Sequence, residues 1–196
     1  MTGEYVVLLD EAGRAIGTAD KRGVHHADTP LHLAFSCYLF DSDGMVLVTR
    51  RALDKPTFPG LWTNGCCGHP APGEDLEDAV RRRVGQELGL RIEGLRLLLP
   101  RFRYRAVLGG VVEHEMCPVF VASTTDEVRA DPAEVAEAHW EPWAEFRRAV
   151  LAGDREVSPW CRDQVAQLPA DPLTAPAASS DDLPSAARDA RRGERS

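Results

Sequence analysis

The chain has 196 residues, 43% of them hydrophobic, which is enough to bury the core of one domain with a short appendage. Its formal net charge of −8 argues against a general partner for nucleic acid or for a membrane surface, because phosphate groups need a basic face. The five cysteines form no C-x-x-C pair, and the sequence shows neither a signal peptide nor a long apolar run, so we expect a cytoplasmic protein in a reducing compartment.

The predicted strands are short and are mostly joined by turns. Tyr5 to Leu9 and Arg14 to Ala19 flank a glycine-containing connection, which predicts a hairpin. Residues 21–30 are polar and predict a loop, as do residues 52–60, where two prolines exclude a helix. Further strands are predicted over residues 32–40, 45–50, 95–99, 102–106, 111–122 and 137–140.

Residues 73–89 predict one half-buried helix. The apolar side chains that share its inner face at 100° per residue are Leu76, Ala79, Val80, Val84 and Leu88. Arg83 and Glu87 fall within the same face, four residues apart. An unpaired buried charge costs several kcal/mol, so these two side chains need partners such as each other, a metal ion or an anionic ligand.

Two more helices are predicted, over residues 142–151 and 158–168. From residue 169 the chain is rich in Pro, Ala, Ser, Asp and Arg and almost lacks large apolar side chains. This composition predicts a disordered tail over residues 169–196, following a domain of residues 1–168. The order of strands and helices predicts an α+β or α/β fold with a sandwich built around a mixed sheet.

Two carboxylates are predicted to share one face of the strand over residues 111–122. The period of two places Glu113 and Glu115 on the side of Val111 and Cys117, whereas His114 points the other way. Like charges this close repel one another, so a bound cation is the economical explanation for the pair.

Several side chains form a candidate set for binding divalent ions. The possible ligands of a first ion are His25, His32, His69, Glu113 and Glu115. Imidazole and carboxylate together suit Zn²⁺ or Mn²⁺, and five ligands exceed the four of a structural zinc. Glu87 suggests a second ion, Mg²⁺, shared with substrate phosphates, and the cations available for those phosphates are Lys21, Arg51, Lys55 and Arg83. The residues alone therefore predict a divalent-metal enzyme that acts on a small phosphorylated molecule.

The segment from Gly68 to Leu90 resembles a Nudix box, G-x5-E-x7-R-E-U-x-E-E-x-G-U. It departs at two positions, where Arg83 and Gln86 replace glutamates of the box. The resemblance implies an α/β/α sandwich. The replaced glutamates bind metal in the pyrophosphohydrolases of the family, so their loss argues against hydrolysis.

The particular departures resemble the type I isopentenyl-diphosphate isomerases. The supporting motifs are Thr63-Asn64-x-x-Cys67-Gly68-His69-Pro70, Arg50-Arg51-Ala52 and Glu113-x-Glu115-x-Cys117-Pro118. The resemblance covers about residues 6–160 and leaves the tail out. It implies interconversion of isopentenyl and dimethylallyl diphosphate by protonation and deprotonation through a tertiary carbocation.

The same resemblance implies roles for individual residues. Cys67 and Glu115 match the two acid/base groups, Tyr104 matches a hydrogen-bonding partner of Glu115, and Trp160 matches the aromatic wall that faces the cation. The implied ligands of the first ion, which is Mn²⁺, Zn²⁺ or Mg²⁺, are His25, His32, His69, Glu113 and Glu115. Glu87 and the Cys67 carbonyl are implied for Mg²⁺, and Lys21, Arg51, Lys55 and Arg83 for the diphosphate.

Two alternative functions stay open at this point. One is a Nudix pyrophosphohydrolase acting on a nucleoside diphosphate, and the other is a catalytically inactive Nudix module that only binds a ligand or partner. The sequence also leaves open the oligomeric state, monomer or homodimer, and whether Cys67 or Glu115 gives the first proton. Roles for His26 and Cys66 are equally undecided, although Cys66 is expected to be structural.

Overall fold

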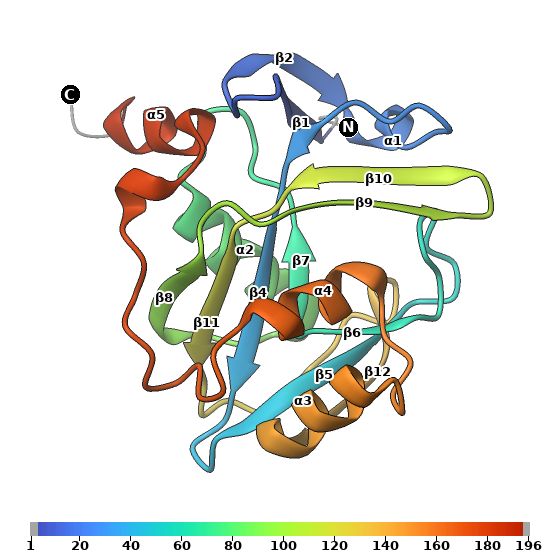
Figure 1. The fold of residues 1–196 in the computed structure, drawn as a ribbon. Helices are drawn as coiled ribbons and strands as arrows, with labels where there is room; N and C mark the ends of the chain where they lie inside the picture. Colours follow the sequence, from blue (N-terminus) through green and yellow to red (C-terminus); the bar gives the residue numbers. More distant parts are fainter. Residues whose placement is uncertain (1–3, 194–196) are drawn as a thin grey trace.

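The computed structural model describes residues 4–193, and its strands form two sheets (Figure 1). The five-stranded sheet has the order β2-β1-β3-β10-β9. Its strands are β1 (Tyr5–Leu9), β2 (Ala15–Asp20), β3 (His32–Leu33), β9 (Arg103–Leu108) and β10 (Val111–Met116). The predicted hairpin of β1 and β2 is confirmed, and so is the turn at Gly109 and Gly110, which both have positive φ.

The second sheet runs in the order β12-β5-β4-β11-β8, with two short strands at its side. These strands are β4 (Phe35–Phe40), β5 (Met45–Arg51), β6 (Trp62–Thr63), β7 (Cys66–Gly68), β8 (Glu93–Leu99), β11 (Val119–Ser123) and β12 (Val135–Pro142). β4 pairs in parallel with β11 and antiparallel with β5 and β7, so the sheet is mixed, as predicted.

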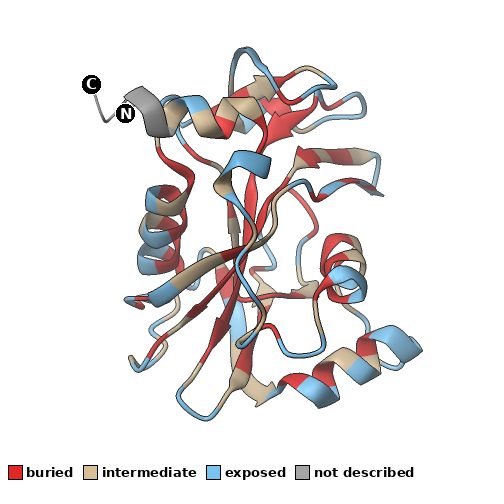
Figure 2. Ribbon diagram, turned by 60° about the vertical axis from the view of Figure 1, so that its left-hand side comes forward, coloured by how far each residue is buried: buried red, intermediate tan, exposed pale blue. Residues whose placement is uncertain are grey.

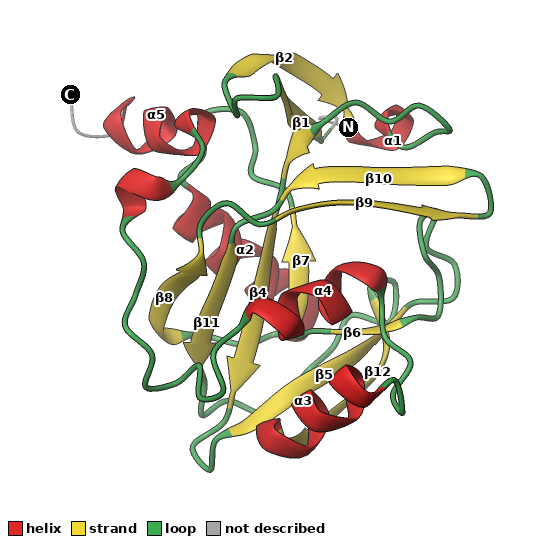
Figure 3. Cartoon of the chain, viewed as in Figure 1, coloured by secondary structure: helices red, strands yellow, loops and turns green. Residues whose placement is uncertain are grey.

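Helices cover both faces of the second sheet, which gives the predicted α/β/α sandwich (Figure 3). The helices are α1 (Lys21–Val24), α2 (Leu76–Leu88), α3 (Trp143–Ala152), α4 (Pro159–Gln167) and α5 (Ser185–Gly193), with a 3₁₀ turn over Ser180–Asp182. β4 is buried along its whole length (Figure 2). Its side chains alternate, with Phe35 and Leu39 in the core under α2, and Tyr38 and Phe40 in the core under α3 and α4.

Two strands predicted as continuous are each divided between the two sheets. The predicted strand 32–40 is broken at Ala34, and the predicted strand 111–122 is broken at Cys117 and Pro118. Pro118 has no N–H to give to a ladder, and its carbonyl instead accepts a hydrogen bond from Ser36 N at 3.0 Å. The breaks let β3 and β10 pair in one sheet while β4 and β11 pair in the other.

Two segments predicted as irregular are ordered in the structure. Lys21–Val24 forms the short helix α1, because Asp20 caps it by accepting a hydrogen bond from Arg22 N at 2.8 Å. In the segment predicted to be disordered, residues 169–193 lie along the domain, and Leu183 is only 1% exposed. Residues 194–196 of that prediction lie outside the described residues. The division of the chain at residue 168 stays a prediction.

The C-terminal segment is held by backbone contacts that its composition does not reveal. Ala178 N donates to Leu97 O at the edge of β8, and Ala186 N donates to Gly13 O at the tip of the β1–β2 hairpin. Arg96 donates to the carbonyls of Pro172 and Leu173. Among the described residues, no helix has the length and apolar character that crossing a membrane requires.

Candidate active site

A cavity of about 240 Å³ lies where the two sheets meet, and most of the predicted site residues line it. Those lining residues are Lys21, His25, Arg51, Lys55, Cys67, His69, Arg83, Tyr104, Glu113, Glu115 and Trp160. His32 lies beside the cavity and contacts His69, and Glu87 lines a smaller recess that also contains Cys67. The structure thus brings together side chains from opposite ends of the chain.

The sheet register places three of these side chains in one row. Glu115 on β10 is paired with His32 on β3 and with Tyr104 on β9. His69 follows β7 directly and reaches the same place from the second sheet. The junction between the sheets therefore determines the position of the polar cluster.

Four potential metal ligands converge at this junction. One ligand atom each from His25, His32, His69 and Glu115 lies within 4.8 Å of the others. His69 Nε2 is 2.9 Å from Glu115 Oε1 and 3.2 Å from His32 Nε2. His26 is outside this group, and its Nδ1 accepts a hydrogen bond from Asp28 N.

The donor set fits a divalent ion. His25 Nε2 and His69 Nδ1 are buried and have no hydrogen-bond partner among the described residues. Burial lowers the pKa of both imidazoles to about 4, so both are neutral and able to act as ligands at neutral pH. Burial alone would raise the pKa of Glu115, but the hydrogen bonds from His32 and His69 hold it well below its usual range. For His32, burial lowers the pKa, but the hydrogen bond to Glu115 and the charge of that carboxylate together outweigh burial and raise it. Imidazoles with an ionised carboxylate are typical ligands of Zn²⁺ or Mn²⁺.

Glu113 stands beside this group rather than in it. Its side chain shares the cavity with Glu115, as the alternation along the strand predicts, and Tyr104 OH lies 2.8 Å from an oxygen of each carboxylate. Burial and the charge of Glu115 raise the pKa of Glu113. His114 is on the opposite face, 2.9 Å from Arg103, as predicted.

Cys67 and Cys66 point to opposite sides of β7. Cys66 is buried in the core under α2, whereas Cys67 is partly exposed and lies against the core that contains Trp160. Burial raises the pKa of Cys67 to about 11, so its thiol is protonated at neutral pH. The geometry therefore makes Cys67 the cysteine that can reach a ligand in the cavity.

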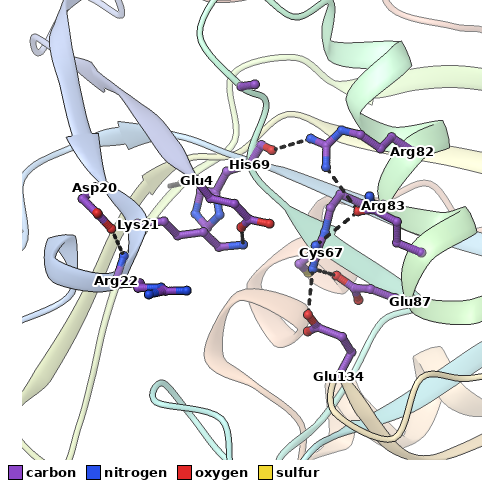
Figure 4. A network of polar contacts seen from close by, with 12 residues as sticks. Glu4, Asp20, Lys21, Arg22, Cys67, His69, Arg82, Arg83, Glu87 and Glu134 are labelled. Carbon is purple, nitrogen blue, oxygen red and sulfur yellow. Dashed lines mark hydrogen bonds and ion pairs between the residues drawn. The ribbon is translucent and has the colours of Figure 1, made fainter. Parts of the chain in front are cut away.

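The cations at the mouth of the cavity are held by carboxylates. Arg83 on α2 contacts Glu87 on the same helix and lies 3.3 Å from Glu134 (Figure 4). Glu134 also contacts Lys55. Lys21 is 2.6 Å from Glu4. Arg83 and Glu87 thus form the i,i+4 pair that the helix pattern allows, and Arg83 Nε is buried without a partner among the described residues.

Trp160 forms an aromatic wall of the cavity from the first turn of α4. It is 1% exposed, and its ring centroid lies 5.3 Å from Phe58 and 5.5 Å from Tyr104. The Arg51 guanidinium lies over the indole, 5.5 Å from its centroid, and is fixed by the carbonyls of Thr57 and Phe58. An indole face in this place is able to stabilise a positive charge.

Sequence reasoning missed several residues that contact the predicted site. Glu134 bridges Lys55 and Arg83, Ser36 is buried next to Cys67, and Gln164 is buried behind Ser36 and bonds to it. No local pattern marks these positions, because their partners lie far away along the chain. Asn64 belongs to a motif quoted above, but its contact with the Cys67 sulfur is visible only in the structure.

Residues 30–161 match the NUDIX domain family. The chain is 57% identical over 188 residues to the isopentenyl-diphosphate Delta-isomerase of Saccharopolyspora erythraea, covering 94% of this chain and 97% of that protein. It is 60% identical over 170 residues to the isopentenyl-diphosphate Delta-isomerase of Mycolicibacterium vanbaalenii, covering 86% of this chain and 93% of that protein.

Solved structures of lower identity share the fold. A crystal structure of a Deinococcus radiodurans protein matches with a TM-score of 0.64 and 16% identity, covering 84% of this chain and 98% of that one. The MutT protein of Methanosarcina mazei matches with a TM-score of 0.56 and 20% identity, covering 70% of this chain and 92% of that one. At these identities the likeness shows the Nudix-like fold alone.

Proposed function

The chain belongs to the family of isopentenyl-diphosphate Delta-isomerases, built on a NUDIX domain, and we propose that it interconverts isopentenyl and dimethylallyl diphosphate in the cavity between its sheets. One observation carries the proposal. A single cavity contains a thiol, three carboxylates, an indole wall and five cationic side chains. Such a set suits the shift of a double bond in a small diphosphate better than it suits hydrolysis.

The reaction needs two acid/base groups that act on different carbons. In the direction toward dimethylallyl diphosphate, one group gives a proton to the terminal alkene carbon and leaves a tertiary carbocation. The other group removes a proton from the neighbouring methylene carbon, so the double bond moves and the proton count balances. Cys67 and Glu115 are the proposed pair, and both line the cavity.

The carbocation has to be stabilised until it loses the proton. Trp160 is the proposed wall for it, because an indole face attracts a cation by about 2 kcal/mol or more when water is excluded. The burial of Trp160 and its contacts with Phe58 and Tyr104 support this role, since they exclude solvent on that side. Tyr104 is proposed to hold the Glu115 carboxylate in place through its hydrogen bond.

Two divalent ions are part of the proposal. His25, His32, His69 and Glu115, with Glu113 next to them, would hold the first ion, which is Mn²⁺, Zn²⁺ or Mg²⁺. Bound there, it would supply positive charge that stabilises the ionised form of the Glu115 carboxylate. Glu87 and the Cys67 carbonyl are the proposed ligands of Mg²⁺ that arrives with the diphosphate.

The proposed diphosphate clamp consists of Lys21, Arg51, Lys55 and Arg83. Ammonium and guanidinium groups give charge-assisted hydrogen bonds to phosphate oxygens. Arg83 replaces a glutamate of the Nudix box and Gln86 replaces another, which favours binding of an intact diphosphate over its hydrolysis. This is why the isomerase is preferred to a pyrophosphohydrolase and to an inactive binding module.

A small-molecule substrate and a cytoplasmic location complete the proposal. The net charge of −8 argues against nucleic acid as a partner, since the basic groups of the site are confined to one cavity. The five cysteines, all within the described part of the chain, are free thiols, which suits a reducing compartment.

The test is an assay that follows both possible products. The protein is incubated with isopentenyl diphosphate and Mg²⁺, and dimethylallyl diphosphate and released phosphate are measured together. The proposal predicts allylic product without phosphate. Phosphate release without the allylic product would favour the hydrolase, and neither product from folded, metal-loaded protein would favour the binding module.

A further inference from the structure

The sulfur of Cys67 has two polar neighbours that are fully buried. Ser36 Oγ lies 3.3 Å from it, and Asn64 Oδ1 lies 3.3 Å from it on another side. Ser36 and Cys67 are direct cross-strand partners of β4 and β7, so the register itself holds the hydroxyl against the sulfur. None of the roles proposed above uses either neighbour.

The orientation of the Asn64 amide is fixed by its other contacts. Asn64 Nδ2 donates to the carbonyls of Cys37 at 3.1 Å and Cys66 at 3.0 Å. Both N–H groups of the amide are therefore used, and Oδ1 is left as an acceptor, which also receives Thr63 Oγ1 at 3.0 Å. The Cys67 thiol is accordingly the donor in its contact with Asn64.

The Ser36 hydroxyl is oriented from the opposite side by a buried series of hydrogen bonds. Gln164 Nε2 on α4 donates to Ser36 Oγ at 2.9 Å, and Gln164 Oε1 accepts from Tyr38 OH at 3.0 Å. Because Ser36 Oγ already accepts a hydrogen bond from the amide, its own hydrogen is free to point at a sulfur. The two sulfurs within reach are Cys67 at 3.3 Å and Cys117 at 3.4 Å.

We propose that Ser36 and Asn64 are positioning residues that hold the Cys67 sulfur in one rotamer facing the cavity, and that Gln164 and Tyr38 act through Ser36. The inference rests on the proposed function of Cys67 as an acid/base group. Asn64 accepts from the thiol while the thiol keeps its proton, and the Ser36 hydroxyl is able to donate to the sulfur in both protonation states. The sulfur thus keeps one place through both halves of the reaction.

The arrangement also joins two parts of the site through one helix. Trp160 and Gln164 are four residues apart on α4 and are both buried, so they share its inner face. One side chain forms the aromatic wall of the cavity, and the other orients the partner of the thiol. A shift of α4 would therefore move the wall and the thiol together.

The test compares Ser36→Ala, Gln164→Leu and the double variant in the isomerase assay. Ser36→Ala is expected to lower kcat about 10-fold and to change KM less than about twofold, because the sulfur loses a hydrogen bond while the diphosphate clamp is intact. The double variant is expected to be no slower than Ser36→Ala alone, since Gln164 acts only through Ser36.

Thr124→Val is the matched control for a lost buried hydroxyl, because the Thr124 hydroxyl donates to Arg91 O and lies outside the cavity. Its kcat should match wild type.

A second measurement does not depend on turnover. Crystal structures of wild type and of Ser36→Ala should show one Cys67 rotamer in the former and a displaced or divided sulfur position in the latter. If Ser36→Ala is unstable, Tyr38→Phe provides the same test, with a smaller fall in kcat. A single unchanged rotamer in the variants, or additive effects on kcat, would overturn the positioning role. An inactive wild type with the expected rotamers would instead contradict the proposed function and leave the positioning role standing.

Discussion

At the scale of single residues, Arg83 illustrates how one substitution changes the chemistry of a fold. It lies on the buried face of α2 between Glu87 and Glu134, at a position where the Nudix box has a glutamate. A guanidinium there cannot bind a metal ion, but it can bind a diphosphate through two N–H groups at once. Under the proposed function, the change of this one side chain favours holding a diphosphate over cleaving it.

The two adjacent cysteines provide the first prediction at this scale. Cys67→Ala should lower kcat at least about 100-fold, because positioned acid/base groups contribute about 10²- to 10⁴-fold. Cys66→Ala should keep kcat within about twofold, since Cys66 points into the core under α2. Steady-state kinetics of both variants checks this. An active Cys67→Ala alongside an inactive Cys66→Ala would show that the wrong thiol has been chosen.

Tyr104 provides the second prediction, because its hydroxyl joins two buried carboxylates. Tyr104→Phe should lower kcat about 10- to 100-fold, the effect of a hydrogen bond to a charged group worth about 1.5–3 kcal/mol. Tyr5→Phe is the control, as Tyr5 is 50% exposed. Wild-type kcat in Tyr104→Phe would show that the bridge between Glu113 and Glu115 has no part in turnover.

The site residues could be predicted from the sequence to the extent that they belong to local patterns. The alternation along β10 placed Glu113 and Glu115 on one side, and the helical period placed Arg83 beside Glu87. Gln164 and Glu134 could not be found in this way. Gln164 meets Ser36 across 128 positions, and Glu134 meets Lys55 across 79, so only the folded chain brings them together.

At the scale of elements, the predicted strands and helices were mostly confirmed, while their breaks were not foreseen. The mostly apolar run over residues 33–40 continues through Ala34 and gives no signal of a break there, whereas Pro118 is a signal that the prediction of one strand over residues 111–122 overlooked. The C-terminal segment differs from its prediction for another reason. Its composition is that of a disordered chain, but Leu183 and Ala187 are buried and its backbone bonds to β8 and to the first hairpin.

The C-terminal segment carries the prediction that belongs to this scale. Leu183→Ala should lower the free energy of unfolding by about 2–5 kcal/mol, since Leu183 is fully buried and its loss leaves a cavity. Leu151→Ala should change it by less than about 0.5 kcal/mol, because Leu151 is 45% exposed. Urea unfolding of the two variants compares them. Equal stabilities would mean that the segment does not pack on the domain in solution.

At the scale of the whole molecule, the site exists because two sheets meet. Each sheet alone carries an incomplete set, with Glu115, Tyr104 and His32 on one and Cys67 on the other. α4 closes the cavity with Trp160. An ion held by His25, His32, His69 and Glu115 would therefore link the end of α1, the first sheet and the residue that follows β7, and should stabilise the entire fold.

Removal of that ion is the fourth prediction. At an ion concentration of 100 times Kd, binding adds about 2.7 kcal/mol, so chelation should lower Tm by about 5–10 °C in a chain of this size. Adding Mn²⁺ or Zn²⁺ back should restore Tm. The His69→Ala variant should show no such gain, whereas His139→Ala should behave as wild type because His139 lies outside the cluster. A Tm that changes neither when the chelator is added nor when the ion is restored would contradict the metal site.

The most direct test of the central claim is exchange of substrate hydrogen with solvent. Wild-type protein, metal-loaded and supplied with isopentenyl diphosphate and Mg²⁺ in D₂O, is followed by NMR spectroscopy of the recovered diphosphates. Protonation and deprotonation by Cys67 and Glu115 predict deuterium in the new methyl group of dimethylallyl diphosphate, with the diphosphate intact. Allylic product without deuterium, or an absence of product from folded and metal-loaded protein, would contradict the account.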